Sequence, residues 1–254
     1  MCVSEVGIEE IKNLIQRPEV SPATFNGDRR ALHSFFEWCL RQDYCPTNPV
    51  ARIASAKVER LEPVILSLGQ IKGLLGAAQD HKDGVLVPYM SLALFCGLRP
   101  KELERLNWDD IALDEKLVTI RGAAAKLRER RIVEVTDNAI EWLRAHHGKH
   151  AIVGENFRRD FDAVRRLSGF KGSVYRKKCD AVLKPWPADV LRHVAISYWQ
   201  AKFKDEGRCA DRHGNSVEVI HRHYRGLVKP QDAEAFWQLI PESVEAELRA
   251  QREA

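Results

Sequence analysis

Apolar residues at helical spacing mark the elements in the first part of the chain. Ser21-Pro22 is typical of a helix N-cap and first helical residue, and the apolar positions that follow keep helical spacing to near Tyr44. A shorter helix is predicted at residues 9–16, and Asn48-Pro49 begins another short helical piece. Together these segments predict a small helical domain at residues 1–55.

A polar segment at residues 56–63 follows this domain. It has no apolar period that a core could use, so we expect an interdomain linker. Ser67 and Gln70 then form the capping-box pattern of a helix start, and a larger second domain is predicted at residues 64–254. Further helices are predicted at residues 85–96, 100–106, 138–145, 156–167, 188–202, 216–224, 231–239 and, as a tail, 242–252.

Two β-rich runs interrupt the helices of the second domain. Residues 117–121 and 131–135 are separated by a turn segment that contains Lys126, so they predict a β-hairpin with Lys126 at its tip. Residues 85–96 are apolar on nearly all sides, which predicts a buried helix, and Gly97 suits the left-handed turn that ends it. The predicted fold class is therefore mainly α with a small β-hairpin or sheet (α+β).

Composition restricts the class of protein. The 254 residues are 44% hydrophobic, which is enough for a buried core. The sequence has no apolar run of about 18 residues and no basic N-terminal region followed by an apolar stretch, so we expect neither a membrane span nor a signal peptide. The six cysteines form no Cys-x-x-Cys pair, which argues against a zinc ribbon and a disulfide framework. We expect a soluble, cytoplasmic protein.

Charge is informative only where it is clustered. The 40 basic and 36 acidic residues give a net charge of +4, which by itself is weak evidence for nucleic acid binding. Basic clusters either contact a phosphate backbone or form a solvated face. The clusters are Arg128, Arg130 and Arg131; Arg158 and Arg159; Arg165 and Arg166; and Lys171, Arg176, Lys177 and Lys178.

The strongest chemical signals are three motifs in the second domain. Gly97-Leu98-Arg99-Pro100-Lys101-Glu102-Leu103 resembles the G-L-R-x-x-E-L signature of the tyrosine recombinases, also called phage integrases. Leu191-Arg192-His193 resembles the H-x-x-R-H box of the same family, and Asn215 and Tyr224 are separated as the family separates its last histidine from its tyrosine. An ordinary helical turn with Arg99 paired to Glu102 is the alternative for the first motif.

The resemblance implies a fold, a reaction and a set of residues. Residues 1–55 would be the family's helical core-binding (SAM-like) domain, and residues 64–254 its catalytic domain. Tyr224 would attack DNA and form a 3′-phosphotyrosine, Arg99 and Arg192 would bind the phosphate, and Lys126 would protonate the leaving 5′-oxygen. Paired guanidinium groups can stabilise the transition-state charge themselves, so we expect no cofactor and no metal. The expected partners are double-stranded DNA and further copies of the chain, as a tetramer on DNA.

Two positions depart from the family. Asp189 stands where the first histidine is usual and Asn215 where the later one is usual. Asn215 can still donate an amide hydrogen bond to a phosphate oxygen. Asp189 would serve either as the base for Tyr224 or, as we favour, to orient Arg192, because an anion beside the phosphate opposes the arginines.

The remaining candidates are assigned to DNA binding, with His223 also expected to position Tyr224: Arg128, Arg130, Arg131, Lys177, Lys178, His193 and His223. Metal sites built on the histidines at 146, 147 and 150, or at 221 and 223, are disfavoured because no cysteine or acidic partner lies at ligand spacing. The main alternative function is a catalytically impaired DNA-binding relative of the family. A structural helical protein is the third.

Overall fold

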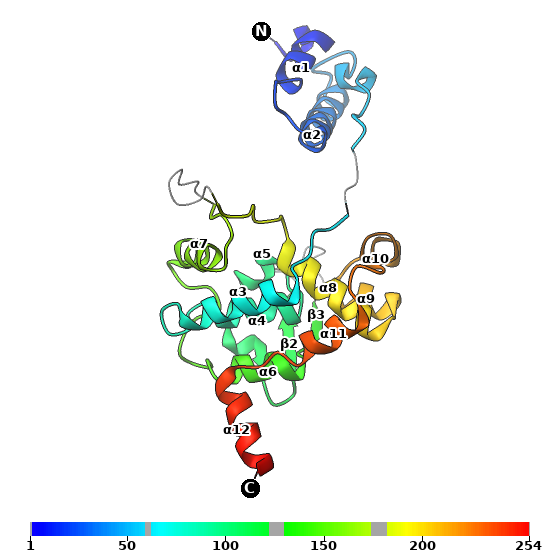
Figure 1. The fold of residues 1–254 in the computed structure, drawn as a ribbon. Helices are drawn as coiled ribbons and strands as arrows, with labels where there is room; N and C mark the ends of the chain where they lie inside the picture. The colour runs from blue at the N-terminus through cyan, green and yellow to red at the C-terminus, as the bar shows by residue number, and fades with distance from the viewer. Residues whose placement is uncertain (1, 59–61, 122–129, 174–181, 254) are drawn as a thin grey trace. The chain divides into compact units, whose positions relative to one another are not determined.

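The computed structural model describes residues 2–58, 62–121, 130–173 and 182–253. The chain divides into two units, residues 1–61 and residues 62–254 (Figure 1). The division falls inside the polar segment for which a linker is predicted. Among the described residues, no helix combines the length and apolar character needed to cross a membrane.

The first unit is built from short helices around its own core. These are the 3-10 helix η1 (Val3–Glu5), α1 (Ile8–Ile15), α2 (Pro22–Arg41) and the 3-10 helix η2 (Pro49–Arg52). The Ser21 hydroxyl accepts from the Thr24 amide, so the predicted N-cap of α2 is confirmed. Ile11, Phe36 and Val50 are buried together in this core.

The second unit is mainly helical. Its helices are α3 (Leu68–Asp80), α4 (Val87–Phe95), α5 (Pro100–Leu103), the 3-10 helix η3 (Trp108–Asp110), α6 (Asp137–Arg144), α7 (Phe157–Leu167), α8 (Val190–Phe203), α9 (Glu206–His213), α10 (Val217–Tyr224), α11 (Pro230–Trp237) and α12 (Glu242–Glu253). The capping box at the start of α3 is confirmed, since the Ser67 hydroxyl accepts from the Gln70 amide and the Gln70 side chain accepts from the Ser67 amide.

A small antiparallel sheet lies among these helices, in the order β1-β2-β3. β2 (Leu117–Ile120) pairs with β3 (Arg131–Glu134), which confirms the predicted hairpin. β1 (Ile111–Ala112) adds a short edge strand that was not predicted, because two residues are too few for a recognisable strand pattern. The predicted fold class, mainly α with a small sheet, is correct.

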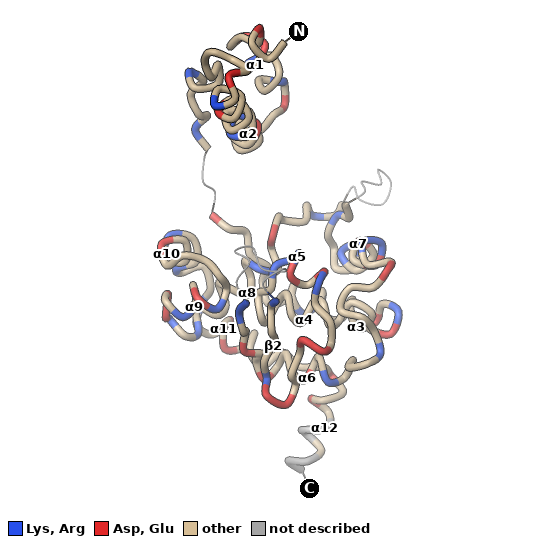
Figure 2. Tube along the Cα trace, turned by 180° about the vertical axis from the view of Figure 1, so that it is seen from behind, with Lys and Arg blue, Asp and Glu red and all other residues tan. Residues whose placement is uncertain are grey.

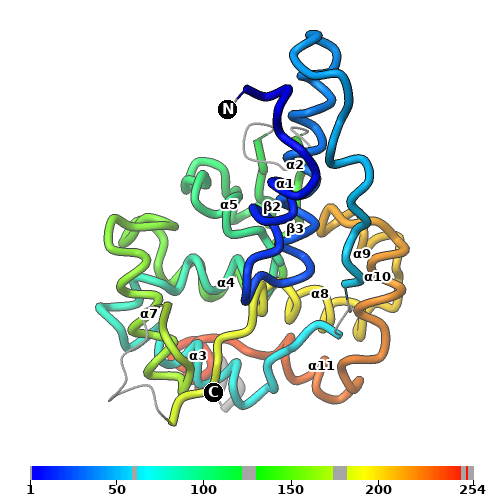
Figure 3. The backbone as a smooth tube through the Cα atoms, turned by 90° about the horizontal axis from the view of Figure 1, so that it is seen from above, coloured from blue at the N-terminus to red at the C-terminus, as the bar shows by residue number. Residues whose placement is uncertain are grey.

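The centre of the second unit is α4, whose nine residues are all buried, as the all-round apolar pattern predicts. It contacts α6 and α8, and α8 contacts α11. The helices α4, α8 and α11 can be followed in Figure 3. Phe236 of α11 is fully buried, with its ring 5.1 Å from Phe95 and 4.3 Å from Tyr198. The helix predicted at residues 231–239 is therefore present, and it packs into the core.

The basic residues of α7 do not all fit the two predicted interpretations of a basic cluster, which are contact with a phosphate backbone and a solvated face. Figure 2 shows Lys and Arg mixed with Asp and Glu along α7. Arg158 and Arg159 are exposed there, but Arg165 is only 8% exposed. Its guanidinium binds the Asp162 carboxylate and stacks 4.7 Å from the Phe161 ring centre. Arg165 is thus a packed structural residue rather than part of a phosphate-tracking or solvated face.

Candidate active site

The site is organised around one buried carboxylate, that of Glu102 in α5. Its side chain is 1% exposed. Its Oε2 accepts from the Arg99 amide at 2.9 Å, and its Oε1 binds Arg99 Nη1 at 3.1 Å. The same Oε2 atom also accepts from Arg131 Nη2, on strand β3, at 2.7 Å. The Arg99–Glu102 pair considered from the sequence is therefore present, and it coexists with a larger arginine cluster.

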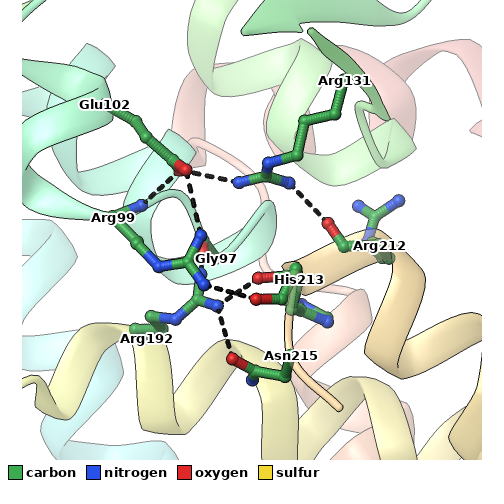
Figure 4. Close-up of polar contacts among 9 residues, drawn as sticks. Gly97, Arg99, Glu102, Arg131, Arg192, Arg212, His213 and Asn215 are labelled. Atoms are coloured by element: carbon green, nitrogen blue, oxygen red, sulfur yellow. Dashed lines mark hydrogen bonds and ion pairs between the residues drawn. The ribbon is translucent and has the colours of Figure 1, made fainter. Parts of the chain in front are cut away.

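The third arginine comes from α8 and faces the same place (Figure 4). Arg192 is 8% exposed. Its Nη1 donates to the Gly97 carbonyl at 2.5 Å, and its Nη2 donates to the His213 carbonyl and, at 3.2 Å, to Asn215 Oδ1. The Asn215 oxygen therefore holds Arg192 in place. Donation from its amide nitrogen to a phosphate stays a prediction.

The end of α9 holds all three guanidinium groups. Arg131 donates to the Arg212 carbonyl at 2.6 Å, Arg192 to the His213 carbonyl, and Arg99 to the Gly214 carbonyl at 2.5 Å. Carbonyls at a helix C-terminus have no partner within the helix and carry partial negative charge, so cations bind them well. Three consecutive carbonyls thus fix three arginines that come from separate elements.

The first arginine is aimed by a glycine turn between α4 and α5. Gly97 has φ +64°, a conformation that favours glycine. A Cβ atom there would lie 2.6 Å from Cδ2 of His213, whose ring is completely buried. The His213 Nδ1 in turn lies 2.9 Å from the Cys209 carbonyl. Close packing of this turn on the end of α9 therefore brings the three carbonyls to the arginines.

The cluster holds more positive than negative charge. The guanidinium groups of Arg99 and Arg131 bind the carboxylate of Glu102, whereas that of Arg192 binds carbonyl and amide oxygens beside them. Burial and, to a smaller extent, the neighbouring charge of Arg99 lower the pKa of Arg192 to about 10. Arg192 remains charged at neutral pH, since that value lies well above 7. Buried positive charge in excess favours an anion, and guanidinium forks match phosphate oxygens.

Tyr224 lies at the last position of α10, beside this cluster. The Ser216 hydroxyl caps the start of that helix. The Tyr224 side chain is buried, and its hydroxyl oxygen lies 2.8 Å from Nδ1 of His193 on α8. Burial raises the pKa of Tyr224, the charge of Arg192 lowers it, and that of Asp189 raises it. The phenol is therefore close enough to Arg192 to interact with its charge.

The structure gives two predicted residues surroundings that the sequence did not indicate. His193, assigned to DNA binding, contacts the Tyr224 hydroxyl. Asp189 is exposed, has φ +49°, and among the described residues makes no hydrogen bond to Arg192 or Tyr224. The orienting role favoured for Asp189 therefore has no direct contact to support it. His223 is half-buried and lowers the pKa of His193.

Some of the remaining predicted site residues lie within the described part of the chain, and others lie outside it. Arg130 is exposed, and Arg131 is engaged in the arginine cluster. Lys126, Arg128, Lys177 and Lys178 lie outside the described residues. Within the described part of the chain, no group of three His, Cys, Asp or Glu side chains is arranged to hold a metal ion.

Sequence reasoning missed α9 and the residues that it contributes. The segment Glu206–His213 is short and mostly charged, and only Cys209, Ala210 and His213 are buried. The signals that could have found it are Asp205, whose side chain accepts from the Arg208 amide, and Gly214, which ends the helix with φ +60°. Glu102 was seen only as a partner of Arg99, and its second arginine was not foreseen.

Comparison with known proteins gives sequence relatives and structural neighbours. Residues 65–178 match the phage integrase family. The tyrosine recombinase XerC of Chlamydia muridarum is 28% identical over 186 residues, covering 69% of this chain and 58% of its own length. XerC of Xanthomonas campestris pv. campestris (strain B100) is 33% identical over 131 residues, covering 51% and 39%. The chain thus spans less than two thirds of the length of these relatives.

Solved structures share the fold. A λ integrase dimer bound to a COC′ core site has a TM-score of 0.67 at 17% identity, covering 90% of this chain and 83% of the other. A λ integrase tetramer bound to a Holliday junction has a TM-score of 0.62 at 16% identity, covering 85% and 64%. The family match, the XerC relatives, the fold and the motifs agree. The chain is similar to the tyrosine recombinases of the phage integrase family, and the family match itself covers residues 65–178.

Proposed function

We propose that this protein is a site-specific DNA recombinase that cleaves and rejoins DNA strands through a 3′-phosphotyrosine formed on Tyr224. The observation that carries the proposal is the position of the buried Tyr224 hydroxyl beside a cluster of three arginines with excess positive charge. The XerC relatives, named as tyrosine recombinases, support the same reaction.

The arginine cluster fits the charge changes of this reaction. A DNA phosphodiester carries one negative charge, and attack by the phenol oxygen adds charge to its non-bridging oxygens. Arg99 and Arg192 are held by carbonyls before any phosphate arrives, so they need little reorganisation to stabilise that charge. Preorganised electrostatic stabilisation of this kind is usually the largest contribution to catalysis.

The other half of the step is the departure of the 5′-oxygen. We assign its protonation to Lys126, on the segment between β2 and β3, as the family resemblance implies. The phosphotyrosine keeps the energy of the broken phosphodiester, so rejoining by a 5′-hydroxyl requires no ATP. The protein would act in the cytoplasm, associated with the nucleoid.

The partners we propose are double-stranded DNA and further copies of the chain. Arg130 is exposed on the second unit, next to the cluster residue Arg131, where it could contact the DNA backbone. The first unit would act as the core-binding domain. λ integrase is known as a dimer and as a tetramer on DNA, which supports a tetramer on DNA here.

A catalytically impaired DNA-binding relative is the second candidate, because Asp189 and Asn215 replace the family's histidines and, among the described residues, Asp189 makes no hydrogen bond to the phenol. A library of nicked duplexes, randomised in sequence on both sides of the nick, separates the two. A nick close to the scissile phosphate lets the short strand diffuse away, so an active enzyme is trapped on DNA. We expect a protein–DNA adduct that resists denaturation. Salt-sensitive binding without any adduct would favour the impaired relative.

A further inference from the structure

The phenol of Tyr224 needs a proton acceptor, and the structure places a histidine against its hydroxyl. A phenol has a reference pKa of about 10, so it is a weak nucleophile at neutral pH unless a base takes its proton. Burial raises the pKa of Tyr224 further, which makes that need greater. The position at which the family keeps its first histidine is Asp189.

Asp189 is badly placed for this task. It precedes α8 in a left-handed conformation, its side chain is exposed, and among the described residues it makes no hydrogen bond to Tyr224. Its negative charge raises the pKa of Tyr224, so it opposes formation of the phenolate. His193, one turn further along the same helix, has its Nδ1 atom 2.8 Å from the Tyr224 oxygen. That distance is within the range required of a general base.

We propose that the imidazole of His193 is the general base for Tyr224. In this chain, residue 193 accepts the phenol proton in place of residue 189. The proposal rests on the proposed recombinase function. In the neutral tautomer protonated at Nε2, Nδ1 carries the lone pair that accepts the phenol proton.

In the cleavage step, the Tyr224 oxygen forms a bond to phosphorus while its proton moves to Nδ1 of His193. The bond between phosphorus and the 5′-oxygen breaks, the electron pair goes to that oxygen, and the oxygen takes a proton from the general acid, assigned to Lys126. Rejoining reverses each transfer, and the imidazolium of His193 returns its proton to the departing phenol.

The surroundings of His193 suit a base that starts neutral. Among the described residues, the charged and titratable groups that act on it are Asp189 and Arg192 on its own helix and His223 and Tyr224 on α10. Burial lowers the pKa of His193, as do Arg192 and His223, whereas Asp189 raises it. The imidazole is thus unprotonated at neutral pH, and Asp189 stabilises the imidazolium that forms on proton transfer. This electrostatic support is the role we assign to Asp189.

The test compares substitutions at three positions in single-turnover cleavage of a nicked duplex selected by the wild-type protein from the randomised library. His193→Asn leaves an amide oxygen near the Nδ1 position but no base, so we expect a loss of about 100-fold or more. Asp189→Asn leaves the base in place, and we expect a loss within about tenfold. His221→Asn is the matched control, since His221 is exposed on the same helix as Tyr224 and bonds to Glu206. It should cleave like the wild type.

Three further readouts separate a base from a merely structural histidine. Wild-type cleavage should fall as pH decreases through the lowered pKa of His193, below about 6.5, because the protonated imidazole cannot accept a proton. The His193→Asn variant should lose that limb of the profile. Added imidazole should partly restore His193→Ala, and a duplex with sulfur in place of the 5′-bridging oxygen should not restore His193→Asn, because sulfur relieves only the need for an acid.

The outcomes distinguish this proposal from the function on which it rests. Suppose that the wild type forms adducts. Near-wild-type cleavage by His193→Asn, or a thousandfold loss of cleavage in Asp189→Asn but not in His193→Asn, would then overturn the role of His193 and leave the recombinase assignment intact. Absence of any adduct from the wild type would instead overturn the recombinase function. If His193→Asn unfolds, as judged by circular dichroism, the imidazole response of a folded His193→Ala decides the matter.

Discussion

Arg99 and Arg192 should matter through the geometry of their guanidinium groups as well as their charge. We expect Arg99→Ala and Arg192→Ala each to reduce the cleavage rate by about 100-fold or more, the usual effect of losing a preorganised charge-stabilising group. Lysine at either position keeps the charge but loses the planar fork, so we expect incomplete restoration. Single-turnover cleavage on a nicked duplex measures both effects.

The control for these variants is Arg144→Ala on α6. Arg144 is partly exposed and pairs with Asp114 and Glu141, so this change removes one guanidinium outside the site. It should cleave at the wild-type rate. Cleavage by Arg99→Ala or Arg192→Ala within a few-fold of that control would contradict the phosphate-binding role of the cluster.

At the residue scale, sequence motifs selected side chains that the structure brings together, but did not indicate their contacts. The spacing of Asn215 and Tyr224 and the two arginine motifs pointed to residues that the structure brings together. The contact between His193 and the Tyr224 hydroxyl was not predictable, because it depends on how α8 and α10 pack, and helix packing angles cannot be read from local periodicity. The bond between Arg131 and Glu102 was not predictable either, because it depends on how β3 and α5 come together in the fold.

At the scale of elements, the turn between α4 and α5 depends on Gly97. Gly97→Ala should destabilise the protein by about 2 kcal/mol or more, because left-handed strain costs roughly 1–2 kcal/mol and the new methyl group also meets the His213 ring. Gly148→Ala is the matched control. Gly148 has φ +74° but no atom within 4 Å of the added Cβ, so it should lose only the strain energy. Urea unfolding of both variants measures the difference, and equal losses would show that packing on His213 is unimportant.

The C-terminal helix α12 allows a test of assembly. It extends from the end of the second unit (Figure 1). We expect deletion of residues 242–254 to weaken assembly of several protomers on DNA more than binding of one protomer to a half-site, as for a helix that docks on a neighbouring subunit. Gel-shift titrations resolve the two species. Equal weakening of both would indicate that α12 packs within its own chain.

Element prediction succeeded where the local signals were strong. The cap at Ser21, the capping box at Ser67 and the all-round apolar pattern of α4 each gave a helix where expected. The segment of α9 failed, because its stability comes from Cys209, Ala210 and His213 packing into the core rather than from its own sequence. That omission hid the three carbonyls that hold the arginines, so the centre of the site could not be derived from sequence.

At the scale of the whole molecule, the balance of basic and acidic residues gave a poor prediction of DNA binding, whereas the order of the motifs along the chain pointed to the family. A net charge of +4 gave little indication of DNA binding. Positive charge is gathered locally, in three guanidinium groups supplied by the start of α5, by β3 and by α8, two of which bind Glu102. Elements far apart in the sequence therefore build one arginine cluster, and the global balance of charges does not reveal it.

The most direct test of the central claim is covalent trapping on DNA by the wild type and by Tyr224→Phe. The substitution removes one hydroxyl and no positive charge, so DNA affinity should stay nearly unchanged. The wild type should leave an adduct with a nicked duplex that survives denaturation, and peptide mass mapping should place the nucleotide on Tyr224. The Tyr224→Phe protein should bind the same duplex and leave no adduct. An adduct that persists in Tyr224→Phe, or one that maps to another residue, would contradict the account.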